Sequence, residues 1–143
     1  SESELKRSRG TWNAGDALTG VNFDDARQGR APEIKGEPVP LVYLLAVCPQ
    51  FLTYARAGIS GWRDVLATAG LVRSMLGVSP DAWEKARVAM GDMAAAAAIA
   101  AILERAEAIR SPGGYLRALT ERAERGHFSI RPMLAALEAA GKA

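Results

Sequence analysis

The segment "MAAAAAIAAILERAEAIR", residues 93–110, constrains the fold of this chain more than any other stretch. Alanine has the highest helix propensity of all residues, so the segment predicts a helix, with Asp92 as its cap. Its apolar stripe recurs at helical spacing and comprises Ile99, Ile102, Leu103, Ala106 and Ile109. Because alanine side chains are small, a neighbouring element can approach closely. The run therefore predicts tight core packing, with a ligand groove as the alternative.

Start and stop signals divide the rest of residues 39–143 into further helices. Serines that suit an N-cap stand at Ser60, Ser79, Ser111 and Ser129, and Pro80 and Pro112 follow two of them. Glycines that suit a helix end stand at Gly77, Gly91 and Gly126. The apolar stretch "VPLVYLLAV" predicts a short helix that is buried on most sides. We therefore predict an all-α fold, a compact bundle of about six or seven short helices.

Residues 1–38 differ from this helical part. They are rich in Gly, Pro, Asp and Arg and have no sustained apolar period, which predicts a linker or flexible arm before a helical domain at 39–143. Trp12 and Phe23 are the large aromatic residues of the arm, either incidental or part of a short docking motif. Because the chain starts with Ser1 rather than Met, we expect it to be a piece of a longer protein.

The overall composition excludes few partners. The formal net charge is +2, from 18 basic and 16 acidic residues, so it favours nucleic-acid binding no more than it opposes it. No apolar run reaches the length of a membrane span, so no membrane contact is expected. Cys48 is the single cysteine, which excludes an internal disulfide and fits an intracellular, reducing environment.

The residues that usually carry catalysis or bind metals are sparse. His127 is the single histidine and stands in a predicted connection, far from Cys48 in the sequence. A Cys–His nucleophile pair and a zinc site are therefore not expected. The stretch "SPGGYL" lacks the spaced glycines and the Lys-Ser/Thr pair of a phosphate-binding loop. We expect no enzyme, no catalytic residue, no metal, no cofactor and no small-molecule substrate.

Arginines cluster around the predicted hinge at residues 110–131. The candidate site residues for DNA or a partner are Arg110, Tyr115, Arg117, Arg122, Arg125 and Arg131. Guanidinium groups on one corner of the fold would favour a phosphate backbone. However, Glu121 and Glu124 lie among them at helical spacing, so a solvated, salt-bridged helix face is the competing interpretation.

Three stretches of the chain carry a resemblance to a known family. These are "LAVCPQFLTYARAGISGWRDVLATAGLVRSMLGVSPDAWEKA", "VAMGDMAAAAAIAAILERAEAI" and "SPGGYLRALTERAERGHFSIRPMLAAL", preceded by a polar linker. In this order they resemble the C-terminal domain of the RepC replication initiator family of repABC-type plasmids. The likeness covers roughly residues 39–140, and "PGGYLRAL" alone would be a weaker signal.

The resemblance implies a role in starting replication at a plasmid origin, in the bacterial cytoplasm. In that family an N-terminal winged-helix part is the usual candidate for origin DNA binding, and the C-terminal domain carries no catalytic motif. The implied function here is a protein-interaction or assembly module, whose partner is a host replication protein or another initiator copy. The alternative is an accessory DNA-binding module for duplex or single-stranded origin DNA, through the arginine corner. A purely structural domain is a third interpretation.

Overall fold

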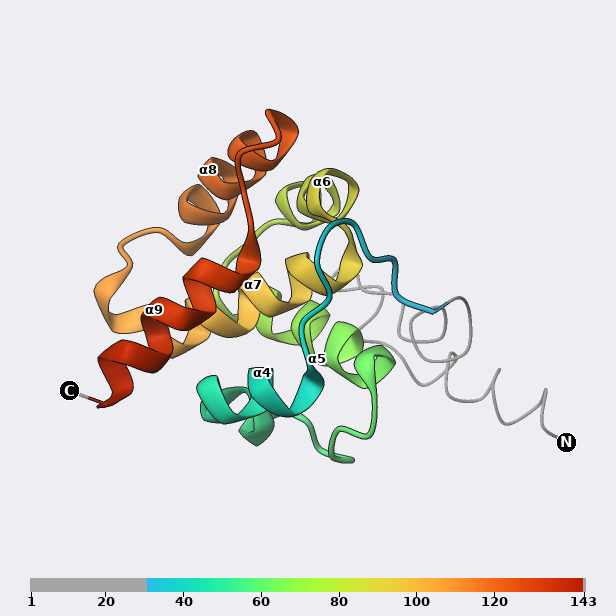
Figure 1. Ribbon diagram of the computed structural model, residues 1–143, viewed down its shortest axis with the longest axis vertical. Coiled ribbons are helices and arrows are strands. Elements are labelled where there is room, and N and C mark those ends of the chain that lie inside the picture. Colours follow the sequence, from blue (N-terminus) through green and yellow to red (C-terminus); the bar gives the residue numbers. More distant parts are fainter. Residues whose placement is uncertain (1–30, 143) are drawn as a thin grey trace, which may run out of the picture.

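The computed structural model describes residues 31–142 of the chain (Figure 1). These residues form six α-helices and two short 3-10 helices, without a strand. Their bounds are α4 (Leu41–Val47), η1 (Pro49–Tyr54), α5 (Trp62–Met75), α6 (Pro80–Met90), α7 (Asp92–Glu104), η2 (Ala106–Ala108), α8 (Pro112–Glu124) and α9 (Ile130–Lys142). The predicted all-α class is confirmed. None of these helices has the length and hydropathy that a membrane span requires.

Helix α7 is the centre of the bundle. Every residue from Ala95 to Ile102 is fully buried, at 0% exposure, and α5, α6, η1, α8 and α9 all contact this helix. The alanine run explains this position, since methyl side chains allow neighbours to approach α7 on every side. The predicted tight core packing is confirmed, although the burial surrounds the helix and is not confined to one stripe.

The caps of α6 and α8 agree with the sequence. The Ser79 hydroxyl accepts a hydrogen bond from the Ala82 amide at 3.1 Å, and the Ser111 hydroxyl accepts one from the Gly114 amide at 3.0 Å. A proline opens both helices. Each of these caps satisfies an amide that has no partner within its own helix.

Three local predictions were wrong. Helix α7 ends at Glu104 and not at Arg110, because the chain turns through η2 toward α8. Ser60 is not the cap of α5: Gly61 takes that position, and the amide and hydroxyl of Ser60 both donate to Asp64. Asp92 is the first residue of α7, and its carboxylate is engaged elsewhere.

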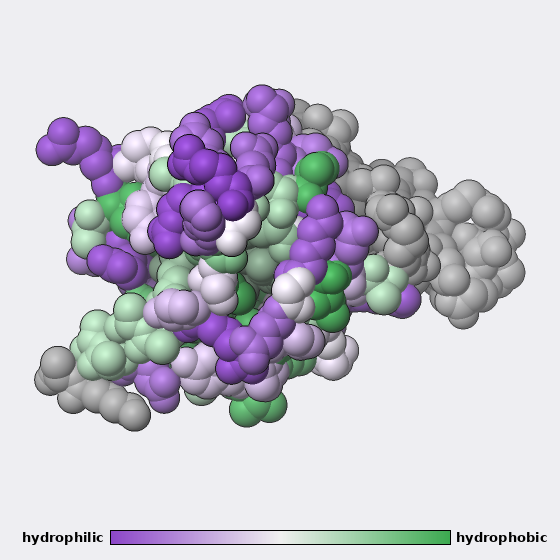
Figure 2. Space-filling model, turned by 45° about the horizontal axis from the view of Figure 1, so that its top comes forward, coloured by the Kyte–Doolittle hydropathy of each residue, from purple (hydrophilic) through white to green (hydrophobic). Residues whose placement is uncertain are grey.

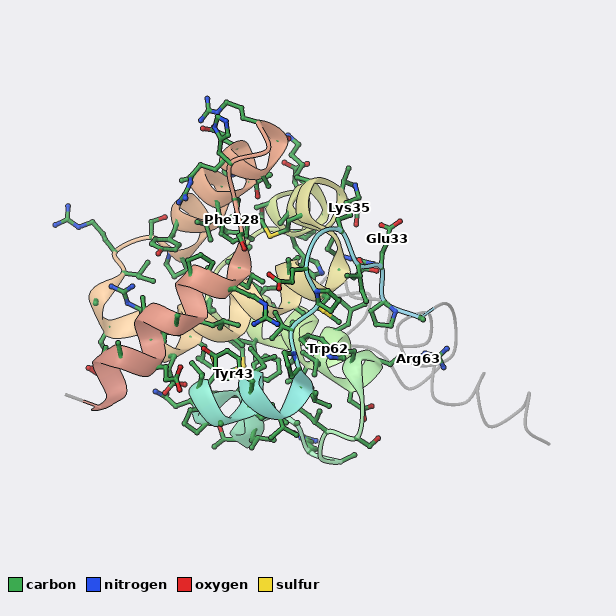
Figure 3. The ribbon with its side chains drawn as sticks, in the orientation of Figure 1. Glu33, Lys35, Tyr43, Trp62, Arg63 and Phe128 are labelled. Carbon is green, nitrogen blue, oxygen red and sulfur yellow. The ribbon has the colours of Figure 1, made fainter. Side chains whose placement is uncertain are left out.

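That carboxylate holds the segment of residues 31–38, which we call the strap. It accepts from the Glu33 amide at 2.8 Å and from Arg87 Nε at 2.9 Å, while the Glu33 carbonyl accepts from the Met93 amide at 3.1 Å. Lys35 Nζ donates to the Val88 carbonyl. The strap crosses α6 and the start of α7 before the chain reaches α4 (Figures 1 and 3). The arm predicted over residues 1–38 includes these bound residues, while Trp12 and Phe23 lie outside the described part.

Candidate functional site

The six predicted site residues are spread over the length of α8 and beyond it. Arg110 precedes the cap of α8, and Arg125 is the C-cap of the same helix. At about 1.5 Å per residue, the helix separates these two positions by roughly 20 Å. Tyr115 is half-buried and packs against the hydrophobic core. The structure therefore spreads the arginines along α8 and onto the start of α9 and does not gather them at one corner.

Arg117 lies where α8 contacts α6. Its Nη2 is 3.4 Å from Asp81 Oδ2 and 3.5 Å from the Ser79 hydroxyl. Asp81 also pairs with Lys85 at 3.4 Å. The pKa of the Asp81 carboxyl is lowered, first by its hydrogen bond and charge interaction with Lys85 and then by those with Arg117. The charge of Arg117 is therefore shared with a neighbouring carboxylate.

The C-terminal end of α8 is mixed in charge. The Arg122 guanidinium lies 5.9 Å from the centre of the Phe128 ring, and its Nη2 is 3.5 Å from the His127 carbonyl oxygen. Arg125, Glu121 and Glu124 are exposed. Hydrophilic side chains gather over the part of the surface where α8 comes forward in Figure 2. Such a surface is well solvated, and its carboxylates weaken the attraction that the arginines exert on phosphates.

Arg131 belongs to another part of the fold. At the start of α9, its Nε lies 3.2 Å from Glu37 Oε1 and its Nη2 donates to the Pro38 carbonyl at 3.0 Å. It therefore anchors the strap to α9.

The described residues contain no group of three His, Cys, Asp or Glu side chains that could hold a metal ion. Cys48 is fully buried, and burial, with a smaller effect of Glu104, raises the pKa of its thiol to about 12. His127 is exposed in the connection between α8 and α9.

A groove that the sequence analysis did not predict lies between α4, the end of α7 and the C-terminal half of α9. We call it the α4–α9 groove. It has a volume of about 840 Å³ and is lined by Tyr43, Ala46, Val47, Pro49, Glu104, Arg105, Ala136, Leu137, Glu138, Ala140 and Gly141. Tyr43, on α4, faces α9, and its hydroxyl donates to Glu138 Oε1 at 3.1 Å (Figure 3). Small and aliphatic residues form most of its lining, so the groove is largely apolar.

An apolar ridge adjoins the groove. Its residues follow one another at spacings of four, three and three, and all are exposed: Val42, Ala46, Pro49 and Leu52. Val42 is 80% exposed and Leu52 is 42% exposed. The first helix is covered on most sides, as predicted: Leu44 is fully buried, and Leu41, Tyr43, Leu45 and Val47 pack partly buried against the core. The prediction did not include its one open side, where Val42 and Ala46 are exposed. In Figure 2 the nearby C-terminal half of α9 is a pale green band at the lower left.

Comparison with known proteins finds a protein family that this chain matches. The profile of the family "Replication protein C C-terminal region" matches residues 40–140. A protein of Rhizobium rhizogenes with the provisional name replication protein C is 49% identical over 116 residues, which cover 78% of this chain and 29% of that protein. A protein of Sinorhizobium fredii with the same provisional name is 47% identical over 115 residues, covering 78% of this chain and 28% of that protein.

This chain spans less than a third of the length of these curated relatives. No solved structure matches it.

Proposed function

This chain belongs to the replication protein C family, as a C-terminal region, and we propose that it is the protein-interaction and assembly domain of a plasmid replication initiator. It would act in the bacterial cytoplasm without catalysing a reaction. Origin DNA would be bound by the full-length protein, and the domain would contact another initiator copy or a host replication protein.

The observation that carries this proposal is the apolar face formed by the α4–α9 groove and the ridge. Side chains such as Val42 gain nothing from exposure to water, and apolar patches on a folded surface often mark sites where another protein binds. Of the large hydrophobic side chains that are exposed in the described residues, Val42 and Leu52 belong to this face, and Ile34, Met75 and Val88 lie elsewhere. A contact face for a partner accounts for an arrangement that folding alone leaves unexplained.

DNA binding by this domain has weaker support. A DNA-binding face needs cations that are available to phosphates. Arg117 pairs with Asp81, and Arg131 pairs with Glu37. Glu121 and Glu124 stand among the remaining arginines of α8.

The test uses a plasmid replicon whose full-length replication protein C contains this region. Ala140→Arg places a charged side chain in the groove, while Ala118→Arg makes the same change on the exposed face of α8 and serves as the control. We expect the groove variant to lower plasmid establishment at least tenfold, and the control variant to leave it unchanged. Origin binding by the full-length protein and its melting temperature should be the same in both.

Normal establishment with Ala140→Arg would remove the groove as the functional face. If Arg117→Ala with Arg122→Ala instead abolished origin binding in a folded protein, the accessory DNA-binding function would replace the one proposed.

A further inference from the structure

We propose that the occupant of the α4–α9 groove is the same face of a second copy of this chain, so that the domain forms a two-fold symmetric dimer. This inference rests on the proposed function and names its partner. Its three arguments are the continuity of the apolar face, its charge and its size.

The exposed apolar residues and the groove form one continuous face. Ala46 and Pro49 belong to the ridge and also line the groove, so the exposed side chains of Val42 and Leu52 extend its apolar surface. A two-fold axis beside them would place the ridge of each copy in the groove of the other, as an isologous interface requires. An isolated helix or peptide in the groove would leave Val42 and Leu52 exposed, whereas a second copy covers them as well.

The residues of α9 at the groove allow this close approach. Ala136, Ala140 and Gly141 line it with side chains of at most one carbon. Helices with small contact residues pack at the short end of the usual 8–10 Å separation. The groove thus suits a partner surface that can come near its backbone.

The rim of the groove carries both signs of charge. Arg105 is exposed, and the described residues offer it no ion-pair partner. Beside it, Glu104 accepts hydrogen bonds from the amide of Gln50 at 3.2 Å and from its side chain at 3.4 Å. A strongly acidic or strongly basic partner would meet a like charge on this rim. A second copy can instead pair each Arg105 with the partner's Glu104.

The size of the face sets the expected affinity. Eleven residues line the groove, and Val42 and Leu52 extend it. Stable interfaces commonly use about 20–30 residues from each partner. A face of this smaller size suits a reversible dimer with a Kd in the micromolar range, on the order of a transient contact. Such a contact could form when several initiators gather on one origin.

The test is sedimentation equilibrium of the 143-residue chain between about 5 and 300 µM, a range chosen to bracket a micromolar Kd. We expect the mean molar mass to rise from that of a monomer toward that of a dimer as the protein concentration increases. Val42→Glu should raise the Kd at least tenfold, whereas Val88→Glu, at a side chain that is 60% exposed on α6, should not change it. Both variants add the same charge at an exposed valine, so a general effect of charge would change both alike.

Charge exchange tests the orientation of the two copies. Arg105→Glu alone should weaken the dimer, because carboxylates then face one another across the axis. Mixing this variant with Glu104→Arg should restore a dimer that contains one copy of each. A heterodimer no tighter than either homodimer would overturn the assigned pairing.

A chain that stays monomeric at 300 µM would overturn the dimer. So would a dimer that Val42→Glu and Ala140→Arg both leave intact, because its interface would lie elsewhere. The proposed function is tested by a different experiment, the plasmid replicon with Ala140→Arg. If Ala140→Arg blocks plasmid establishment while the chain is monomeric, the groove binds a different partner.

Discussion

At the scale of single residues, Arg73 is the buried charge that the core must accommodate. The residue is 2% exposed, and its Nη1 donates to the Val78 carbonyl at 2.9 Å. Its Nε and Nη2 have no hydrogen-bond partner within the described residues. Burial lowers the pKa of this guanidinium, and no carboxylate of residues 31–142 counteracts that effect. Removing a charge from water without a counter-charge costs free energy, so Arg73 weakens the fold in which it lies.

This arrangement predicts that an apolar side chain replaces Arg73 better than a basic one. Arg73→Met removes the desolvated charge and keeps the volume, at the cost of the Val78 hydrogen bond, worth about 1 kcal/mol. Arg73→Lys keeps a charge that is more strongly hydrated and has no planar fork of donors. We expect the methionine variant to lie within about 1 kcal/mol of the parent chain in urea unfolding, and the lysine variant to be clearly less stable. The reverse order would show that the guanidinium has polar partners in solution.

Cys48 should be unreactive in the folded chain. Its thiol has a pKa of about 12 when folded, against about 8.5 when unfolded. Between these values the unfolded state binds fewer protons, so the free energy of unfolding should fall as the pH rises from about 9 to 12. A thiol reagent at pH 8 should react slowly with the native chain and rapidly in urea. Rapid native labelling would contradict the burial of this residue, and Cys48→Ala, as the control, should have a flatter stability profile in this pH range.

At the scale of elements, the connection between α6 and α7 depends on Gly91. Its φ of 89° and ψ of 160° lie in a region that is essentially restricted to glycine. A Cβ at this position would also lie 2.9 Å from the Lys35 amide nitrogen of the strap. This glycine therefore serves both the turn and the close approach of residues 31–38.

Gly91→Ala should destabilise the chain by more than the roughly 1–3 kcal/mol that such backbone strain costs. Gly77→Ala is the matched control, because Gly77 also has a positive φ, of 82°, but a Cβ there meets open space. Its expected cost is about 1 kcal/mol. In the Gly91 variant trypsin should also cleave earlier at Lys35, since the strap is displaced. If both substitutions lowered the free energy of unfolding equally, the close contact between the strap and Gly91 would contribute nothing to the effect.

The elements also show what the sequence could predict. Caps depend on a few adjacent residues, so the starts of α6 and α8 were readable from Ser-Pro pairs. Burial is a property of the whole fold. The first helix and η1 carry two apolar stripes with related spacing, one with Leu44, Cys48 and Phe51, the other with Val42, Ala46, Pro49 and Leu52.

The structure buries the first stripe and exposes the second. No local pattern distinguishes the two, because the choice depends on where α9 packs against α4, nearly 90 residues later in the chain. The groove and the binding of the strap to Asp92 were unpredictable for the same reason: each joins segments far apart in sequence. The arginines of α8 were correctly expected at the surface, but their spread along the helix follows only from its observed length.

At the scale of the whole molecule, the charge distribution determines how the chain should behave with DNA. The net charge is +2, and several of its cations lie in ion pairs, as Arg117 does with Asp81 and Arg87 with Asp92. On and next to α8, three arginines lie without a carboxylate within ion-pair distance in the described residues: Arg110, Arg122 and Arg125. At most about three phosphates could therefore be neutralised along this helix.

This number predicts the salt dependence of any binding to duplex DNA. With three phosphate contacts, affinity should fall by about 40-fold between 50 and 200 mM salt, whereas a face with six to ten contacts loses about 10³–10⁵-fold. Fluorescence anisotropy at both salt concentrations should thus give weak binding in the range of non-specific complexes. Arg117→Ala with Arg122→Ala should keep the melting temperature and change the affinity only slightly, since Arg117 already pairs with Asp81. Submicromolar binding at 200 mM salt that this double variant abolishes would instead identify α8 as a DNA-binding helix, and the apolar face of α4 and α9 would then need another explanation.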